Sequence, residues 1–88
     1  MIIPEQTAKK SKSRNVVGNV VDGKGAPLIG VTVVEKGTGN GTVTNMEGNY
    51  HITTQGATPV LVFSYIGYQS KEIVVKENTI NIVLEDES

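Results

Sequence analysis

The segment from Gly18 to Tyr68 decides the fold, and it reads GNVVDGKGAPLIGVTVVEKGTGNGTVTNMEGNYHITTQGATPVLVFSYIGY. Short runs rich in Val, Ile and aromatic residues, typical of pleated strands, are separated in it by Gly, Pro, Asn and Asp. These four residue types favour turns because Gly reaches positive φ, Pro fixes φ and lacks an amide hydrogen, and Asn and Asp bond to nearby backbone. The segment therefore predicts short strands joined by tight turns.

The same pattern continues to the end of the chain, so that seven strands are expected. They cover residues 15–22, 31–35, 42–44, 49–53, 60–66, 70–75 and 79–84. Short strands with a turn every few residues, and no helical periodicity, are typical of two sheets packed face to face. The predicted fold class is all-β, a seven-stranded antiparallel β-sandwich.

Within this sandwich, alternation predicts which side chains face the core. Residues 42–44 and 49–53 are expected to form a hairpin around the turn at 45–48, with Gly48 in the left-handed conformation. Tyr50 and Ile52 then point inward and His51 points outward. The most apolar run, residues 60–66, is expected to be a central strand that is covered on both faces.

Near the end of that run, Gly67 is expected to bend the chain so that Tyr68 folds back onto the sandwich. A small core with four aromatic residues favours packing of Tyr68, and the alternative is an exposed recognition residue. The last residues, 85–88, are expected to form a mobile acidic tail.

Length and charge limit what the protein can do. The 88 residues suffice for one domain and one core, which disfavours a deep ligand cavity. The net charge is −1, but the first fourteen residues carry four cations against Glu5 alone. Because this basic leader has no aromatic residue and no apolar periodicity, we expect neither nucleic-acid binding nor membrane insertion. The predicted domains are a disordered basic leader at 1–14, the β-sandwich at 15–85, and the start of a linker or tail at 86–88.

The residues that chemistry requires are sparse. The chain has no cysteine, which excludes disulfides and thiolate metal sites. His51 is the single imidazole, and a hydrolytic site would need Ser64 or Ser70 delivered to it. Ser64 lies in an apolar strand and alternation works against this pairing, so no catalytic residue is assigned and the protein is not expected to be an enzyme.

Two polar turns and one glycine-rich loop are candidate binding sites. Asp22 with Gly23, and Asn45 with Glu47, place oxygen atoms at turns as calcium sites do, but the spacing of an EF-hand loop is missing. The loop at 37–41 is rich in glycine but lacks the Lys-Ser/Thr ending and the helix of a phosphate site. No cofactor and no metal ligand is therefore assigned.

The turn and core positions of this pattern resemble the carboxypeptidase regulatory-like family, a transthyretin-like β-sandwich. Within the family they are most similar to the N-terminal extension of SusC-type TonB-dependent outer-membrane transporters. The residues that carry the resemblance are Gly18, Asp22, Pro27, Gly30, Gly41, Gly48, Tyr50, Phe63, Gly67 and Tyr68. The resemblance implies a transthyretin-like or Ig-like fold for residues 15–85, and since these residues form turns and core, it implies no ligand.

The resemblance also implies a function, a non-enzymatic accessory domain at the periplasmic face of the outer membrane, within a longer exported glycan transporter. It would mediate or modulate contacts with a periplasmic protein or with adjacent domains, through edge strands and glycine-rich loops. A monomer is favoured. One alternative is a structural module that buttresses a peptidase or spaces the domains of a surface protein. Another is binding of a small ligand or calcium at the loops near Asp22, Asn40 and Asn45.

Overall fold

The computed structural model describes residues 13–56 and 58–87, so most of the predicted leader lies outside the described residues. The described residues form seven strands: β1 Arg14–Val21, β2 Thr32–Glu35, β3 Gly41–Val43, β4 Asn49–Thr54, β5 Val60–Ser64, β6 Lys71–Val74 and β7 Ile82–Val83. They confirm the all-β class, since the same residues contain no helix. In particular, this part of the chain has no helix with the length and apolar character needed to cross a membrane.

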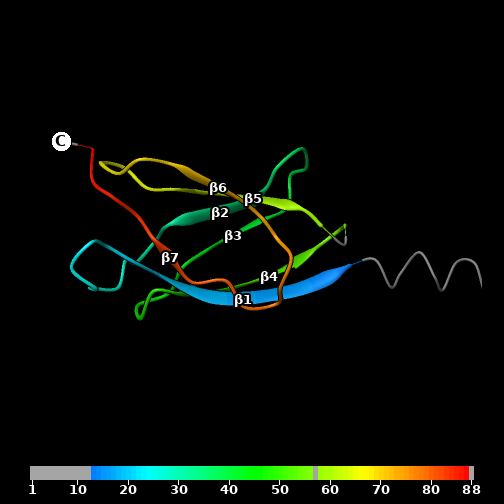
Figure 1. The fold of residues 1–88 in the computed structure, drawn as a ribbon, viewed down its shortest axis with the longest axis horizontal. Coiled ribbons are helices and arrows are strands. Elements are labelled where there is room, and N and C mark those ends of the chain that lie inside the picture. The colour runs from blue at the N-terminus through cyan, green and yellow to red at the C-terminus, as the bar shows by residue number, and fades with distance from the viewer. Residues whose placement is uncertain (1–12, 57, 88) are drawn as a thin grey trace, which may run out of the picture.

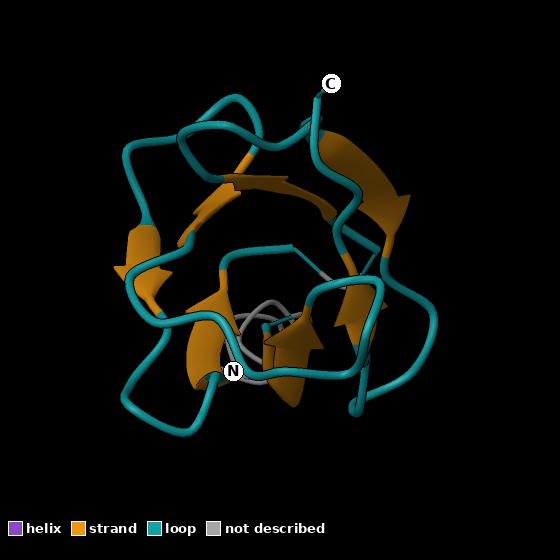
Figure 2. Cartoon of the chain, turned by 90° about the vertical axis from the view of Figure 1, so that its left-hand side faces the viewer, coloured by secondary structure: helices purple, strands orange, loops and turns teal. Residues whose placement is uncertain are grey.

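The strands form two layers that face each other (Figures 1 and 2). One sheet has the order β4-β1-β7 and the other has the order β3-β2-β5-β6. All pairs are antiparallel except β1 with β7, where Val20 lies opposite Ile82 in parallel register. This pair differs from the antiparallel expectation because the chain leaves β6, crosses to the other sheet, and returns beside β1 in the same direction (Figure 1).

The predicted hairpin of β3 and β4 is wrong, although its turn is right. β3 pairs with β2 and β4 pairs with β1, so the turn at 45–48 connects the two sheets. Gly48 has the expected positive φ, 79°. The chain crosses at Thr44, whose buried hydroxyl donates to Leu28 O at 2.6 Å and accepts from Val31 N at 2.9 Å. These bonds hold the end of β3 in its own sheet.

Strand β5 is internal to its sheet, between β2 and β6. Leu61 and Phe63 are fully buried, whereas Val60, Val62 and Ser64 alternate with them and are only half-buried. The expectation that both faces of this run are covered is therefore wrong for the outer face. A two-layer sandwich covers one face of each sheet, and no third layer is present among the described residues.

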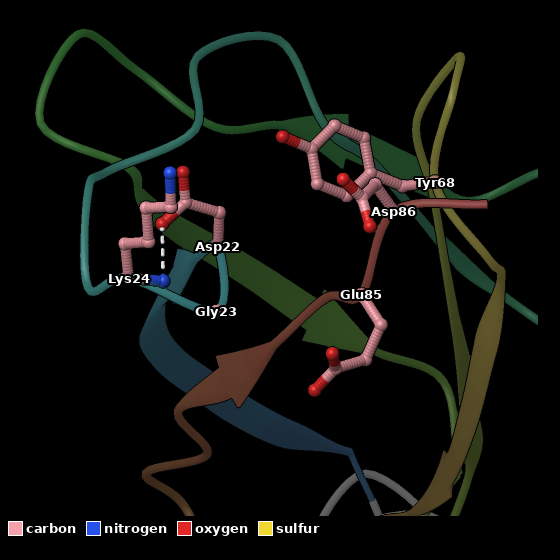
Figure 3. A pocket seen from close by; sticks show the side chains of 6 residues that line it. All are labelled: Asp22, Gly23, Lys24, Tyr68, Glu85 and Asp86. Carbon is pink, nitrogen blue, oxygen red and sulfur yellow. Dashed lines mark hydrogen bonds between the residues drawn. The ribbon is translucent and has the colours of Figure 1, made fainter. Parts of the chain in front are cut away.

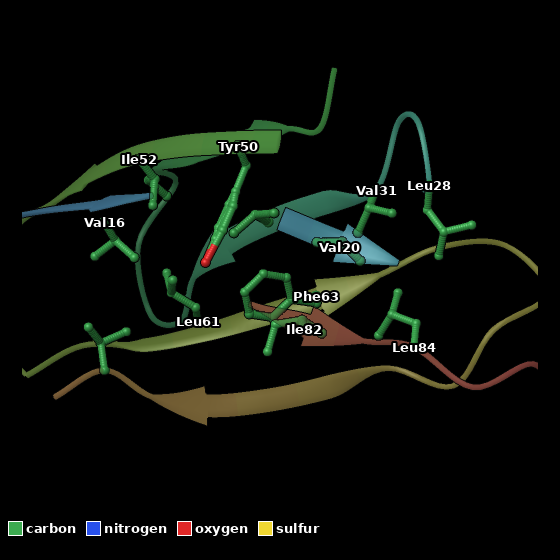
Figure 4. Packing of buried hydrophobic residues seen from close by; sticks show 12 residues of the cluster. Val16, Val20, Leu28, Val31, Tyr50, Ile52, Leu61, Phe63, Ile82 and Leu84 are labelled. Atoms are coloured by element: carbon green, nitrogen blue, oxygen red, sulfur yellow. The ribbon is translucent and has the colours of Figure 1, made fainter. Parts of the chain in front are cut away.

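The core lies between the sheets (Figure 4). Tyr50 and Ile52 point into it and His51 points out, as the alternation predicted. The rings of Tyr50 and Phe63 meet edge to face, with centroids 5.4 Å apart and an interplanar angle of 81°. The buried apolar residues are Val16, Val20, Leu28, Val31, Val33, Tyr50, Ile52, Leu61, Phe63, Val75, Ile82 and Leu84.

A close approach of two backbones closes the core at Gly18. A Cβ placed on Gly18 would lie 1.7 Å from the carbonyl oxygen of Ile80. The same oxygen accepts a hydrogen bond from the Tyr50 hydroxyl at 2.7 Å, and Ile80 N donates to Val17 O at 2.9 Å. Gly18 is therefore required because only hydrogen fits where the segment before β7 runs closely beside β1.

Candidate functional site

Three turns gather at the end of the sandwich where the described chain finishes (Figure 1). They are the turns at 22–25, 45–48 and 65–68. Gly30 N donates to Thr44 O at 3.1 Å, just before the turn at 45–48, and Glu87 N donates to Gly67 O at 3.0 Å, in the turn at 65–68. We call this region, with the loop at 26–30, the C-terminal end.

Apolar side chains stand exposed on these loops. Ile29 is 52% exposed, Met46 79% and Ile66 91%. Exposed apolar residues are common singly, but here one protrudes from each of three loops at the same end of the molecule. The arrangement suits contact with another protein surface better than it suits enclosure of a small molecule.

Asp22 shapes the first of these turns. Its Oδ1 accepts hydrogen bonds from Lys24 N and from Ala26 N, both at 2.9 Å. The bond from Ala26 and then the bond from Lys24 hold the pKa of this carboxyl below its ordinary value. Asn45 repeats the motif, because its Oδ1 accepts from Glu47 N and Asn49 N at 3.0 Å. Oδ1 of Asp22 and Oδ1 of Asn45 thus accept hydrogen bonds from the backbone of their own turns.

Tyr68 sits between the core and the surface of the C-terminal end. Gly67 has φ 86°, and Tyr68 N donates to Tyr65 O at 3.0 Å, which closes the turn. The rings of Tyr65 and Tyr68 pack at 5.6 Å with a tilt of 42°, and both side chains lie half-buried against the core. The side chain therefore folds back onto the sandwich.

A shallow hollow of about 370 Å³ lies beside Tyr68 (Figure 3). It is lined by Asp22, Gly23, Lys24, Tyr68, Glu85 and Asp86. Asp86 lies next to the Tyr68 ring, and these two residues form an isolated antiparallel bridge. Glu85 O accepts from Gln69 N at 2.8 Å. Residues 85–87, expected as a mobile tail, are thus bonded along the 67–69 segment, while the domain boundary at residue 85 stays a prediction.

No metal-binding group of three or more His, Cys, Asp and Glu side chains occurs among residues 13–56 and 58–87. The hydrolytic candidates also lie apart. His51 is exposed on β4 in one sheet, and Ser64 is on β5 in the other. Ser70 is exposed in the connection before β6. The fold thus places Ser64 and His51 in different sheets.

The glycine-rich loop at 37–41 lies at the other end of the sandwich and is organised by Glu35. This carboxylate is buried and accepts from Asn40 Nδ2 at 3.0 Å, from Gln55 N at 2.9 Å and from Gly56 N at 3.3 Å. Asn40 Nδ2 also donates to Thr53 O at 2.7 Å. The polar groups of this loop therefore connect the two sheets. The Asn40 amide nitrogen donates to both Glu35 and Thr53 in this network.

The buried positions of Glu35 and Thr44 were not predicted from the sequence. A signal for Glu35 existed, because it continues the alternation of Val31 and Val33 and so falls on the inward face. Thr44 carries no such signal, since its role depends on residues of another loop.

The remaining motif positions lie in turns and core. Gly30 has φ 82°, Pro27 bridges Val21 in the loop after β1, and Gly41 starts β3. A Cβ on Gly48 would lie 2.7 Å from Val20 O. These positions shape the chain and present no reactive group.

Comparison with known proteins supports the same architecture. A family model described as CarboxypepD_reg-like domain matches residues 16–88. A TonB-dependent receptor of Formosa agariphila is 43% identical over 65 residues, which cover 74% of this chain and 6% of that protein. The TonB-dependent receptor SusC of Bacteroides thetaiotaomicron is 40% identical over 73 residues, which cover 83% of this chain and 7% of that protein. The chain thus spans less than a tenth of the length of these relatives.

Two solved structures share the fold. Both are of type II cohesin–X-dockerin complexes from Acetivibrio cellulolyticus. One matching chain has a TM-score of 0.60 at 24% identity and the other has 0.58 at 25% identity. In each case the match covers 82% of this chain and 51% of the other chain.

Proposed function

Because the chain belongs to the CarboxypepD_reg-like domain family, we propose that it is an accessory, non-enzymatic domain of a SusC-type TonB-dependent nutrient transporter. It acts in this proposal at the periplasmic face of the outer membrane, as part of a longer exported protein that imports glycans. Its task there is to mediate or modulate contacts with the adjacent parts of the transporter or with a periplasmic protein.

One observation carries the proposal. The matched TonB-dependent receptors are 40–43% identical to this chain over most of its length, yet the match takes up only 6–7% of theirs. The matched segment is thus a small part of these receptors, and in this proposal it contributes an accessory role.

The distribution of polar groups supports a role without chemistry. Asp22 and Asn45 close turns, Glu35 connects the loop at 37–41 to the end of β4, and Thr44 holds the end of β3 against the segment at 28–31. Every buried polar side-chain atom in the described part of the chain has a hydrogen-bond partner. These four side chains thus have structural partners, which is consistent with an accessory role.

The C-terminal end is the contact surface that we favour, because Ile29, Met46 and Ile66 protrude there. The same end carries the acidic residues that line the hollow, Asp22, Glu85 and Asp86. Exposed apolar residues together with charged residues are typical of protein interfaces.

The proposal is tested in a full-length transporter that carries this domain. Removal of residues 15–85 is expected to lower glycan uptake or assembly of the transporter in the outer membrane, measured by growth on the glycan and by the amount of receptor in membrane fractions. A variant that tests the loops alone changes Ile29, Met46 and Ile66 to Ser. The matched control changes Val17 and Val43, which are exposed on the sheets, to Ser. Unchanged assembly and uptake after removal of the domain would refute the role.

A structural module that spaces other domains is the second candidate. The observation that favours it is the solved structure at 25% identity, in which this fold occupies 51% of a longer chain. Replacing the domain by an unrelated sandwich of equal size separates the two functions, because a spacer tolerates the exchange and a contact domain does not.

A further inference from the structure

Strand β6 is the outer strand of its sheet (Figure 1), and among the described residues β5 is its one ladder partner. Val75 N donates to Pro59 O at 2.8 Å, and the next pair in the register is Val60 with Val74. Bonded and non-bonded pairs alternate along an antiparallel ladder, so the N–H and C=O of Val74 and of Glu72 point away from β5. β6 therefore presents a row of backbone donors and acceptors on its open side.

The side chains along this edge divide between the two faces of the sheet. Glu72, Val74 and Lys76 are exposed, with Val74 52% exposed. Ile73 and Val75 face the core. Charged side chains on an open edge ordinarily prevent it from pairing with a strand of another molecule. Where both signs are present, their order along the strand decides whether a second strand is repelled or attracted.

The edge sequence at 71–77, KEIVVKE, is complementary in charge to its own reverse. When two copies run antiparallel and Val74 faces Val74 of the second copy, Glu72 faces Lys76 and Lys71 faces Glu77. A shift by two residues in either direction loses these charge pairs, and a register centred on Glu72 sets two carboxylates opposite each other. The register centred on Val74 also opposes residues whose backbone groups point outward in both copies.

We propose that the chain forms a symmetric dimer in which β6 pairs antiparallel with β6 of a second copy, centred on Val74. The pairing adds about six backbone hydrogen bonds and joins the four-stranded sheets into one continuous sheet. It also places the two Val74 side chains together on the outer face, between two Glu72–Lys76 pairs. This state differs from the monomer favoured by the sequence, and it does not depend on the proposed transporter role.

Glu72 has a second partner in its own chain. Lys36 Nζ lies 3.0 Å from Glu72 Oε1, with both side chains about half exposed. Such an exposed pair contributes little to stability, so charge changes at residue 72 are expected to leave the fold intact. The interface is short, and the dissociation constant is expected between about 10 μM and 1 mM.

The test is sedimentation equilibrium of the 88-residue chain from about 10 μM to 1 mM at low salt, where screening is weak. The expected result is a concentration-dependent rise from monomer to dimer mass. Glu72→Lys and Lys76→Glu are each expected to raise the dissociation constant about tenfold, and the double variant is expected to restore it, because the charge pairs are then exchanged. A wild-type chain that stays monomeric up to 1 mM, or a double variant no better than the single ones, would overturn the proposal.

Val74→Pro provides an independent arm. Proline removes the outward N–H of residue 74 without touching a ladder bond to β5, and proline is tolerated on edge strands. Val74→Thr is the matched control, since it keeps both the N–H and the β-branch. Loss of the dimer in the proline variant alone supports the pairing, whereas an unchanged dimer contradicts it. If the proline variant unfolds, the charge-exchange cycle decides.

Discussion

Replacing Gly18 by Ala is the most direct test of how the sandwich is closed. The new Cβ would lie 1.7 Å from Ile80 O, 2.6 Å from Ile80 C and 3.0 Å from the Tyr50 hydroxyl. A carbon and an oxygen without a bond between them need about 3.3 Å, so the segment before β7 must move by about 1.6 Å. A backbone atom cannot turn aside as a flexible side chain does, and the strain therefore falls on the bonds around Ile80.

Three hydrogen bonds depend on this position of the segment. They run from Ile80 N to Val17 O, from Val17 N to Asn78 O and from the Tyr50 hydroxyl to Ile80 O. Their loss costs about 1 kcal/mol each, and the reduced entropy of the unfolded chain returns about 0.4–1 kcal/mol. Adding the disturbed packing of the neighbouring segment, we expect the free energy of unfolding to fall by about 2–4 kcal/mol.

Urea unfolding followed by circular dichroism measures this change. An m-value near 1–2 kcal/mol/M converts the loss into a midpoint lower by about 2 M. Gly39→Ala is the matched control, because Gly39 lacks a positive φ and a Cβ there would meet nothing within 4 Å. It should stay within about 0.5 kcal/mol of the wild type. If Gly18→Ala were as stable as this control, the backbone contact would not be what requires glycine.

Three further predictions concern the buried polar groups. Thr44→Val removes a hydroxyl that bonds to Leu28 O and Val31 N, and it should lower the free energy of unfolding in urea by about 1–3 kcal/mol. Its control is Thr32→Val, at an exposed position, which should lower it by less than about 0.5 kcal/mol. Glu35→Gln puts an amide donor among backbone donors and should cost about 1.5–3 kcal/mol, and an unchanged midpoint would argue against the carboxylate's role. Burial raises the pKa of Tyr50 from 10.0 to about 12. The folded state holds the Tyr50 proton more tightly than the unfolded state, so the stability linked to this proton is fully present below pH 10 and is lost as the pH rises towards 12. Between these pH values the free energy of unfolding of Tyr50→Phe should therefore fall less than that of the wild type. Equal losses in the two proteins would refute the assignment.

The strands and their inward faces were predictable because alternation reports burial directly. Tyr50 and Ile52 face the core for this reason, and the same rule gives the exposure of His51. The turn at Asn45 was also predictable, since an Asx oxygen and a left-handed glycine define it locally.

Pairing between the strands could not be read from the same signals. The turn at 45–48 has one local geometry whether the flanking strands pair or cross to opposite sheets, and the crossing is decided by Thr44 with Leu28 and Val31 far away in sequence. The parallel partner of β1 depends likewise on the fit of Ile80 against Gly18. Both are contacts between distant residues, about which a single sequence carries no periodic signal.

Polar turn residues resemble ligand-binding residues in a sequence, because the same Asp and Asn side chains serve both purposes. An Asp or Asn that closes its own turn places oxygen atoms at a loop as a cation site does, but the bonds from Lys24 N and Ala26 N to Asp22 Oδ1 show that this oxygen serves the turn. The same applies to Asn45 and to the Glu35 network. The exposed apolar residues of the loops and the open edge of β6 are the features on which the proposed contacts with another protein depend.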